Sequence, residues 1–164
     1  PAGKQVVLPA GILFSVEYSR YILGHYPELL CPYPELGQEV EVPIPGKAET
    51  GGWIVKTCVS NGSRKTFSNN LWTAYLDYQK ITSPLKIRQR KPGDRFMPSG
   101  MHGEKKLKDY FIDAKVPRLW RDRIPVIVAG NDVIWLGGYR VDERFKITPS
   151  TSQVLQITLE HACW

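Results

Sequence analysis

The stretch Leu85-Lys86-Ile87-Arg88-Gln89-Arg90 alternates apolar and polar side chains. An alternation of this kind is typical of a β-strand with one buried face, because successive side chains point to opposite sides of a sheet. Leu85 and Ile87 are therefore expected to face the core. The three cationic side chains of the stretch are expected to face the opposite side together.

Further strand-like segments occur on both sides of this stretch. The chain holds 14 glycines and 13 prolines, which divide it into short pieces and favour strands and turns over long helices. Alternating or β-branched segments predict strands at residues 12–18, 39–42, 53–59, 71–78, 124–128, 133–136 and 153–159. Loops are expected at residues 27–37 and 91–103, where proline and glycine gather.

Two short helices are predicted in the C-terminal half. Leu107, Phe111 and Ala114 form one apolar stripe at helical spacing, which predicts a helix over residues 105–114. Pro117 suits the first turn of a second helix over residues 117–123. The predicted fold class is therefore α+β (mixed α/β), with a mainly antiparallel sheet and two short helices in the C-terminal half.

The distribution of charge divides the chain near residue 80. Residues 1–80 hold seven Lys/Arg and seven Asp/Glu, so the whole net charge of +6 lies in residues 81–164. We therefore expect a β-rich linking subdomain at residues 1–79 and a basic domain at residues 80–164. A local excess of cations is typical of a surface that binds a polyanion; an ordinary solvated basic face is the alternative.

Several functional classes lack their sequence signatures. No apolar run approaches the roughly 20 residues that span a bilayer, so no membrane partner is expected. The three histidines are scattered and the three cysteines lie far apart, so neither a metal site nor a disulfide framework is expected. Reduced thiols are typical of a cytoplasmic protein. No cofactor motif or catalytic set is recognisable, which disfavours a free-standing enzyme that acts on a phosphorylated small molecule.

The cationic residues after position 85 can form a single surface, since a basic strand, a loop and a lysine-bearing helix follow one another there. Phosphate contacts supply most of the sequence-independent affinity for nucleic acids, and arginine grips phosphate oxygens in pairs. In the structural alternative, Arg95 pairs with a neighbouring acid and Lys106 pairs with Asp109. The aromatic residues of the region are expected to be core residues: Phe96, Tyr110, Phe111 and Trp120.

Linked motifs in this region resemble one family. The sequence reads Arg88-x-Arg90-x-x-Gly93-Asp94-Arg95-Phe96-x-Pro98-x-Gly100, then Lys105-Lys106-Leu107-Lys108-Asp109-Tyr110-Phe111-Ile112-Asp113 and Lys115-Val116-Pro117-Arg118. With Ala74-Tyr75-Leu76-Asp77 and Ile134-Trp135-Leu136-Gly137-Gly138-Tyr139-Arg140, these motifs resemble the C-terminal domain of bacterial tRNA(Ile)-lysidine synthetases. The resemblance covers about residues 70–145, and residues 1–69 match the linking region more loosely.

The resemblance implies an activity for a longer protein. Members of this family are ligases that use ATP, with magnesium, to adenylate the wobble cytidine of a minor isoleucine tRNA; lysine then displaces AMP to form lysidine. Their catalytic site lies in an N-terminal PP-loop domain, whose Ser-Gly-Gly-x-Asp-Ser loop is absent here. The chain starts at Pro1 without an initiator methionine, so we expect a processed or truncated C-terminal part, inactive alone and without a cofactor.

The resemblance also implies that this C-terminal part contacts the acceptor stem of the tRNA. Carried over to this sequence, it implies RNA contacts at Arg88, Arg90, Arg95, Lys105, Lys106, Lys108, Lys115 and Arg118. The expected partners are tRNA(Ile) and the protein's own N-terminal PP-loop domain, with a homodimer left open and DNA not expected. The rival hypothesis is a structural or self-association module that positions the catalytic domain without contacting RNA.

Overall fold

The computed structural model describes residues 3–26, 31–62 and 67–161. In this part of the chain every pairing between strands is antiparallel, and the strands form four sheets. One α-helix, α1 (Leu107–Asp113), accompanies these sheets within the described ranges. The predicted loop at residues 27–37 lies partly outside the described residues, and the cysteine at position 163 lies wholly outside them.

The predicted α+β fold class with two helices is wrong, because the described residues are mostly antiparallel sheet with a single α-helix. The second predicted helix is only the 3₁₀ turn η4 (Arg118–Trp120). Its backbone closes i→i+3 hydrogen bonds, from Trp120 N–H to the Pro117 oxygen and from Arg123 N–H to the Trp120 oxygen. A segment this short, ended by Pro125, has too few residues to recover the cost of starting an α-helix.

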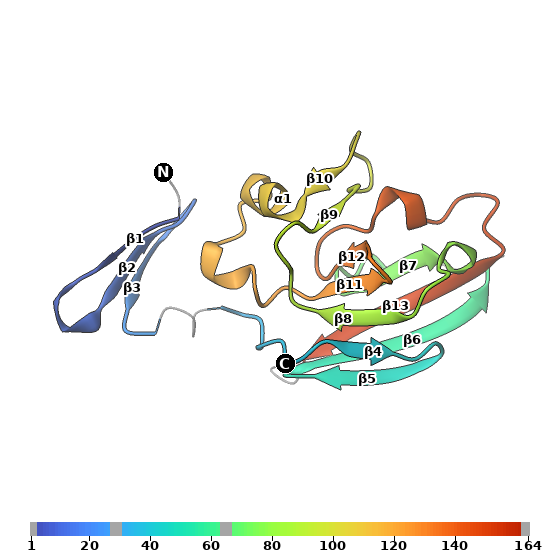
Figure 1. Ribbon diagram of the computed structural model, residues 1–164, viewed down its shortest axis with the longest axis horizontal. Coiled ribbons are helices and arrows are strands. Elements are labelled where there is room, and N and C mark those ends of the chain that lie inside the picture. Colours follow the sequence, from blue (N-terminus) through green and yellow to red (C-terminus); the bar gives the residue numbers. More distant parts are fainter. Residues whose placement is uncertain (1–2, 27–30, 63–66, 162–164) are drawn as a thin grey trace.

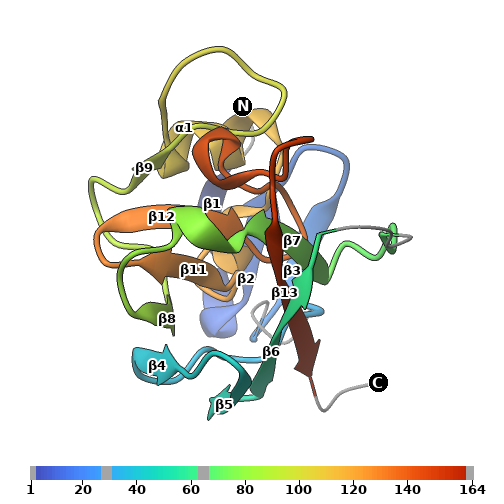
Figure 2. The ribbon, with the colours of Figure 1, turned by 90° about the vertical axis from the view of Figure 1, so that its right-hand side faces the viewer.

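Two four-stranded sheets hold most of the core (Figure 1; Figure 2). The first has the spatial order β12 (Asp132–Leu136), β11 (Val126–Ala129), β8 (Leu85–Arg88) and β4 (Val40–Val42). The second has the order β5 (Gly46–Thr50), β6 (Trp53–Asn61), β13 (Gln153–His161) and β7 (Thr73–Asp77). Both sheets therefore combine strands from before and after residue 80.

The sheet of β12, β11, β8 and β4 is covered on both faces. Leu85 and Ile87 are buried on one face, as the alternation predicts, and pack against the second four-stranded sheet in a cluster that includes Trp53. Val126 and Val128 point to the other face, where they meet the residues buried by α1. The fold is therefore layered, with α1 and its flanking segments outside the first sheet (Figure 2).

Most predicted strands are confirmed as elements of these sheets. The predictions at 12–18, 39–42, 53–59, 71–78, 85–90, 124–128, 133–136 and 153–159 correspond to β2 (Leu13–Val16), β4, β6, β7, β8, β11, β12 and β13. The sequence missed β1 (Lys4–Val7), β5 and the two-residue strands β9 (Arg95–Phe96) and β10 (Lys105–Lys106). The remaining 3₁₀ turns are η1 (Pro9–Gly11), η3 (Tyr78–Lys80) and η5 (Glu143–Phe145).

The first residues form a small separate sheet of β1 (Lys4–Val7), β2 (Leu13–Val16) and β3 (Tyr21–Gly24). This β1–β3 sheet lies at one end of the molecule, beside the segment that contains η4 (Figure 1). The Arg20 guanidinium lies 5.1 Å from the ring centroid of Trp120, and Arg121 Nη2 donates to Tyr18 Oη at 3.4 Å. These contacts tie the sheet to the basic half of the chain.

Candidate nucleic-acid interface

The lysines predicted on one helix are divided between a strand and a helix. Lys105 and Lys106 form β10, which pairs with β9, and α1 begins only at Leu107. Leu107 and Phe111 are buried, but Ala114 is exposed, so the predicted apolar stripe is confirmed at two of its three positions. Non-local pairing with β9 thus overrides the helical propensity of the two lysines.

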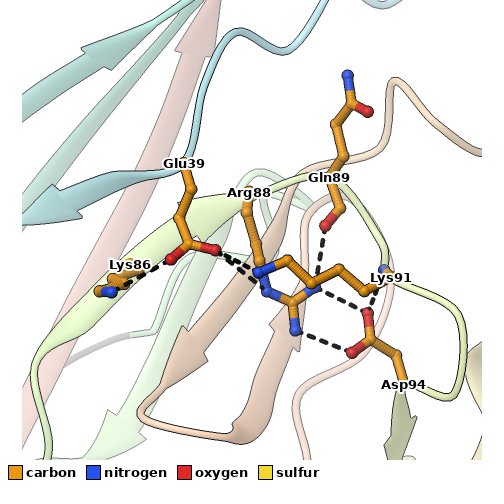
Figure 3. Close-up of polar contacts among 6 residues, drawn as sticks. All are labelled: Glu39, Lys86, Arg88, Gln89, Lys91 and Asp94. Atoms are coloured by element: carbon orange, nitrogen blue, oxygen red, sulfur yellow. Dashed lines mark hydrogen bonds and ion pairs between the residues drawn. The ribbon is translucent and has the colours of Figure 1, made fainter.

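Arg88 does not lie on the exposed face that the alternation predicted. Its side chain is only 8% exposed, and its Nη1 and Nη2 atoms donate hydrogen bonds of 2.8 Å to the two carboxylate oxygens of Asp94 (Figure 3). Nη1 also donates to the backbone oxygen of Gln89 at 2.9 Å (Figure 3). A bidentate, charge-assisted pair of this kind fixes the segment from Arg88 to Asp94. Arg88 therefore supports the loop rather than presenting its charge to solvent.

The environment of Asp94 keeps this carboxylate ionised. Burial acts to raise the pKa of Asp94, but hydrogen bonds from the Arg88 guanidinium and from the Lys91 backbone N–H outweigh it and hold the pKa below its usual value. The Lys91 backbone nitrogen donates to Asp94 Oδ2 at 2.6 Å. Both carboxylate oxygens of Asp94 are therefore bound within the loop, by Arg88 and by the backbone of Lys91.

Glu39, just before β4, gathers a second set of cations (Figure 3). Its carboxylate lies 2.7 Å from Lys91 Nζ, 3.1 Å from Lys86 Nζ and 3.9 Å from Arg88 Nε. Hydrogen bonds from Lys91 and Lys86 hold the pKa of Glu39 below its usual value. A residue of the neutral half of the chain therefore neutralises part of the positive charge of the basic half.

The eight predicted contacts divide into three groups. Arg88 is buried, as described above. Three side chains are exposed or half-buried and pair with acids: Arg90 with Asp122 at 2.8 Å, Arg95 with Glu104 at 2.6 Å, and Lys105 with Asp113. Four side chains are exposed and form no ion pair with any residue that the structure describes: Lys106, Lys108, Lys115 and Arg118. The pair of Lys106 with Asp109, which belongs to the structural alternative, is not formed, whereas the pairing of Arg95 with a neighbouring acid is.

Two cavities bring some of these cations together. The first, which we call the sheet–helix cavity, has a volume of about 450 Å³ and is lined by Arg90, Lys108, Arg118, Arg121, Tyr18, Gly3 and Ile112. The second, of about 310 Å³, is lined by the cations Arg90, Lys91, Lys106 and Lys108 together with Pro92, Gly93, Asp94 and Leu107. The cavities share Arg90 and Lys108. We call the six cations of the two linings the basic face: Arg90, Lys91, Lys106, Lys108, Arg118 and Arg121.

The structure also brings to this region residues that the sequence reasoning missed. Lys91 and Arg121 lie within the basic stretch of the sequence, and that stretch was the signal available for them. Tyr18 and Gly3 carry no local signal, because only the tertiary placement of the β1–β3 sheet brings them next to Arg118.

The aromatic residues next to the basic face belong to the core, as predicted. Phe96, Tyr110 and Phe111 are buried, and the rings of Phe96 and Tyr110 meet edge to face at 5.0 Å. Trp120 is half-buried against the same cluster. Among the residues that the structure describes, no helix is long and apolar enough to cross a membrane, and no cluster of His, Cys, Asp or Glu has an arrangement suited to a metal ion.

Comparison with known proteins places these features in a family. Residues 85–158 match the family model described as the TilS substrate C-terminal domain. The chain is 37% identical over 158 residues to the tRNA(Ile)-lysidine synthase of Dehalococcoides mccartyi (strain CBDB1). The aligned stretch covers 96% of this chain and 34% of that relative. The chain belongs to the tRNA(Ile)-lysidine synthase family. The resemblance inferred from the motifs is therefore confirmed.

Two further similarities agree with this family. The chain is 48% identical over 82 residues to the tRNA(Ile)-lysidine synthase of Parabacteroides distasonis. This aligned stretch covers 50% of this chain and 19% of that relative. A solved crystal structure of a TilS C-terminal domain superposes with a TM-score of 0.66 and 25% identity, covering 78% of this chain and 99% of that chain. The chain spans about a third or less of the length of the curated relatives that it matches, and corresponds to their C-terminal region.

Proposed function

We propose that this chain is the tRNA-binding part of a lysidine-forming ligase and contains no part of the catalytic site. The observation that carries the proposal is the basic face, on which Lys106, Lys108 and Arg118 are exposed and form no ion pair with a described residue. Family membership supplies the nature of the ligand, and the basic face supplies the means of holding it. Residues 80–164 provide the cations of this face, with residues 1–79 as the linking part.

The basic face suits contact with a duplex RNA backbone. Arginine and lysine side chains bind phosphate and release counterions, which gives affinity without base recognition. Neighbouring aromatic residues such as Phe96 and Tyr110 are buried and offer no stacking platform. The acceptor stem of tRNA(Ile) is an A-form duplex, and proteins recognise such duplexes mainly through shape and backbone contacts. We infer that the chain holds this stem while the reaction takes place elsewhere.

The chemistry of the whole protein is a proposal as well. In the part of the relatives that this chain does not span, ATP with magnesium would activate the wobble cytidine, and lysine would displace AMP. The chain itself would need no cofactor. Cys31 and Cys58 are free thiols, which supports a cytoplasmic location for the protein.

Fluorescence anisotropy tests the proposal directly. The labelled ligands would be the minor isoleucine tRNA, its acceptor-stem minihelix and a minihelix of the same length with a scrambled stem, each at two salt concentrations. We expect the tRNA and its minihelix to bind with similar, salt-sensitive affinity, because the contacts lie on the stem. Absence of binding to the tRNA at low salt would contradict the proposal.

A second observation favours an additional, positioning role. Val6, Tyr21 and Leu23 are 55%, 75% and 62% exposed, and strand pairing through Phe14 and Val16 places them on one face of the β1–β3 sheet. An exposed apolar patch on a soluble domain commonly marks an interaction surface. Since the relatives are about three times as long and this chain matches their C-terminal region, the preceding part of such a protein would join the chain just before β1. We propose that this face contacts that preceding part.

Light scattering on the isolated chain distinguishes the occupants of this face. Three results together would support contact with the preceding part. The isolated chain would be a monomer, the full-length Leu23→Glu enzyme would lose lysidine formation, and the isolated Leu23→Glu chain would keep its tRNA affinity. A dimer that Leu23→Glu dissociates would instead identify a second copy as the occupant and favour the self-association module.

A further inference from the structure

The sheet–helix cavity is built from two parts of the chain that lie far apart in sequence. Arg90 follows β8, Lys108 lies on α1, and Arg118 and Arg121 belong to the η4 segment. The opposite wall consists of Tyr18, in the turn between β2 and β3, and of Gly3, which precedes β1. The volume of about 450 Å³ lies within the range of sites that take small ligands or single groups of large ones.

The charge inside this cavity is not balanced by the residues that line it. No acidic side chain is among the described lining residues. Arg90 is held from outside by Asp122, with 2.8 Å between Arg90 Nε and Asp122 Oδ1. Lys108 and Arg118 form no ion pair with any described residue. The cavity therefore concentrates positive charge that an external anion can neutralise.

Two of the lining groups are already oriented. Arg121 Nε donates to the backbone oxygen of Val116 at 3.0 Å, and its Nη2 donates to Tyr18 Oη at 3.4 Å. A guanidinium held at its Nε keeps its remaining N–H donors in a fixed plane, which suits the paired oxygens of a phosphate. Tyr18 Oη accepts from Arg121 and keeps its own proton for a further acceptor.

We propose that the sheet–helix cavity binds a phosphate group of an RNA backbone, and that the β1–β3 sheet forms one wall of the RNA-binding surface. This inference rests on the proposed function and deepens it, since it assigns an RNA contact to residues of the neutral half of the chain. The contact of Arg20 with Trp120 holds the sheet against η4 and so maintains the opposite wall. RNA that occupies the cavity bridges the two walls and stabilises this placement of the sheet.

A matched pair of substitutions tests the inference. Tyr18→Glu places a negative charge in the cavity, whereas Tyr26→Glu makes the same substitution just after β3, on an exposed side chain that does not line the cavity. We expect Tyr18→Glu to weaken tRNA binding about tenfold or more, because a like charge then faces the phosphate. Tyr26→Glu is expected to change the affinity less than about threefold, as screening limits a more distant charge. Equal effects of the two substitutions would overturn the inference.

Arg118→Gln gives a second test that is independent of the fold of the β1–β3 sheet. Arg118 is exposed and lacks a described ion-pair partner, so its replacement is expected to leave thermal unfolding unchanged. Loss of one phosphate contact is expected to reduce the log–log salt slope of tRNA binding by about one. The matched control is Lys47→Gln, which removes an exposed cation from β5, outside the basic face. A slope that is the same in Arg118→Gln and Lys47→Gln would contradict the assignment.

The failure of this inference differs from the failure of the proposed function. If the wild-type chain binds tRNA and Lys106→Gln weakens binding while Tyr18→Glu and Arg118→Gln do not, the cavity is not a phosphate site but the RNA-binding function stands. If the wild-type chain does not bind tRNA, both fail. NMR titrations with inorganic phosphate and with RNA distinguish the two sources of the anion. If the amide resonances of Tyr18 and Arg118 shift with inorganic phosphate but not with RNA, the assignment to RNA is overturned.

Discussion

Arg95 lies directly opposite Lys106 in the β9–β10 ladder, so that two exposed cations face each other across adjacent strands. Like charges in directly opposite positions destabilise a sheet. Glu104 lies 2.6 Å from Arg95 Nε and offsets the charge of Arg95, whereas Lys106 forms no ion pair with a described residue. This arrangement costs folding free energy, and the proposed contact of Lys106 with an RNA phosphate would offset the repulsion.

Replacement of Lys106 should therefore change stability and binding in opposite directions. Lys106→Glu converts the repulsion with Arg95 into an attraction and is expected to raise the free energy of unfolding by roughly 0.5 kcal/mol. The same change is expected to lower tRNA affinity, because it reverses a charge on the basic face. Urea unfolding and anisotropy measure the two effects, and Lys106→Gln should fall between the wild type and Lys106→Glu in both. Unchanged affinity in Lys106→Glu would remove Lys106 from the RNA-binding surface.

Replacement of Arg88 should act on the fold. Arg88→Ala leaves the largely buried carboxylate of Asp94 without its partner and is expected to lower the free energy of unfolding by about 3 kcal/mol. Arg88→Ala combined with Asp94→Ala is expected to recover part of this loss, because no unpaired charge then remains. A double-mutant cycle in urea measures the coupling. A coupling close to zero would show that the pair does not support the loop.

The stability of the chain should fall in acid through two carboxylates. The pKa values of Asp94 and Glu39 are held below their ordinary values of 3.8 and 4.5 by the cations that contact them. At pH values above these ordinary values both carboxylates are ionised in the folded and unfolded chains, and their stabilising contribution is complete. As the pH falls from about 5 to about 2, the unfolded chain takes up the protons first and the contribution is lost. Urea unfolding at a series of pH values should show a shallower decline for Asp94→Asn than for the wild type; an equally steep decline would contradict this assignment.

Lys115 occupies a strained position at the end of α1. Its φ angle is +54°, and its N–H donates to the Ile112 oxygen at 3.0 Å while the Val116 N–H donates to the Phe111 oxygen at 2.9 Å, which together form a Schellman motif. Glycine adopts this conformation without the clash of a Cβ atom, so Lys115→Gly is expected to raise the free energy of unfolding by about 1 kcal/mol.

The same substitution tests whether Lys115 contacts RNA. Lys115→Gly should lower tRNA affinity if the side chain reaches a phosphate, and Lys115→Asn, which also tolerates a positive φ, should lower it to the same extent. Anisotropy measures both variants. An affinity equal to that of the wild type would show that this lysine is tolerated at a strained position without serving RNA binding.

The sequence predicts best the elements whose own pattern determines their burial. β8 buries Leu85 and Ile87 as their alternation predicts, and the long strands β6 and β13 follow from runs of β-branched and apolar residues. The two-residue strands β9 and β10 have no periodicity to detect, so the sequence predicts a loop over β9 and a helix over β10 and does not predict their pairing.

The candidate site was predictable as a stretch but not as a surface. The motifs locate the cations in the sequence. The alternation of β8 predicts that Arg88 is exposed, because a local pattern carries no information on Asp94 or Glu39, which contact Arg88 from other segments. Tyr18 reaches the basic face only through the docking of the β1–β3 sheet on η4. Local propensity carries no information on such contacts between distant segments.

The salt dependence of tRNA binding tests the central claim most directly. We would measure the dissociation constant for the minor isoleucine tRNA as a function of salt, for the wild type and for Lys106→Ala/Lys108→Ala/Arg118→Ala. If the face neutralises about five phosphates, the wild type should give a log–log slope of order −3 to −4, and the triple variant should lose about two to three units of slope while its thermal unfolding is unchanged. The same slope in both proteins would contradict the claim that these three side chains bind the tRNA backbone.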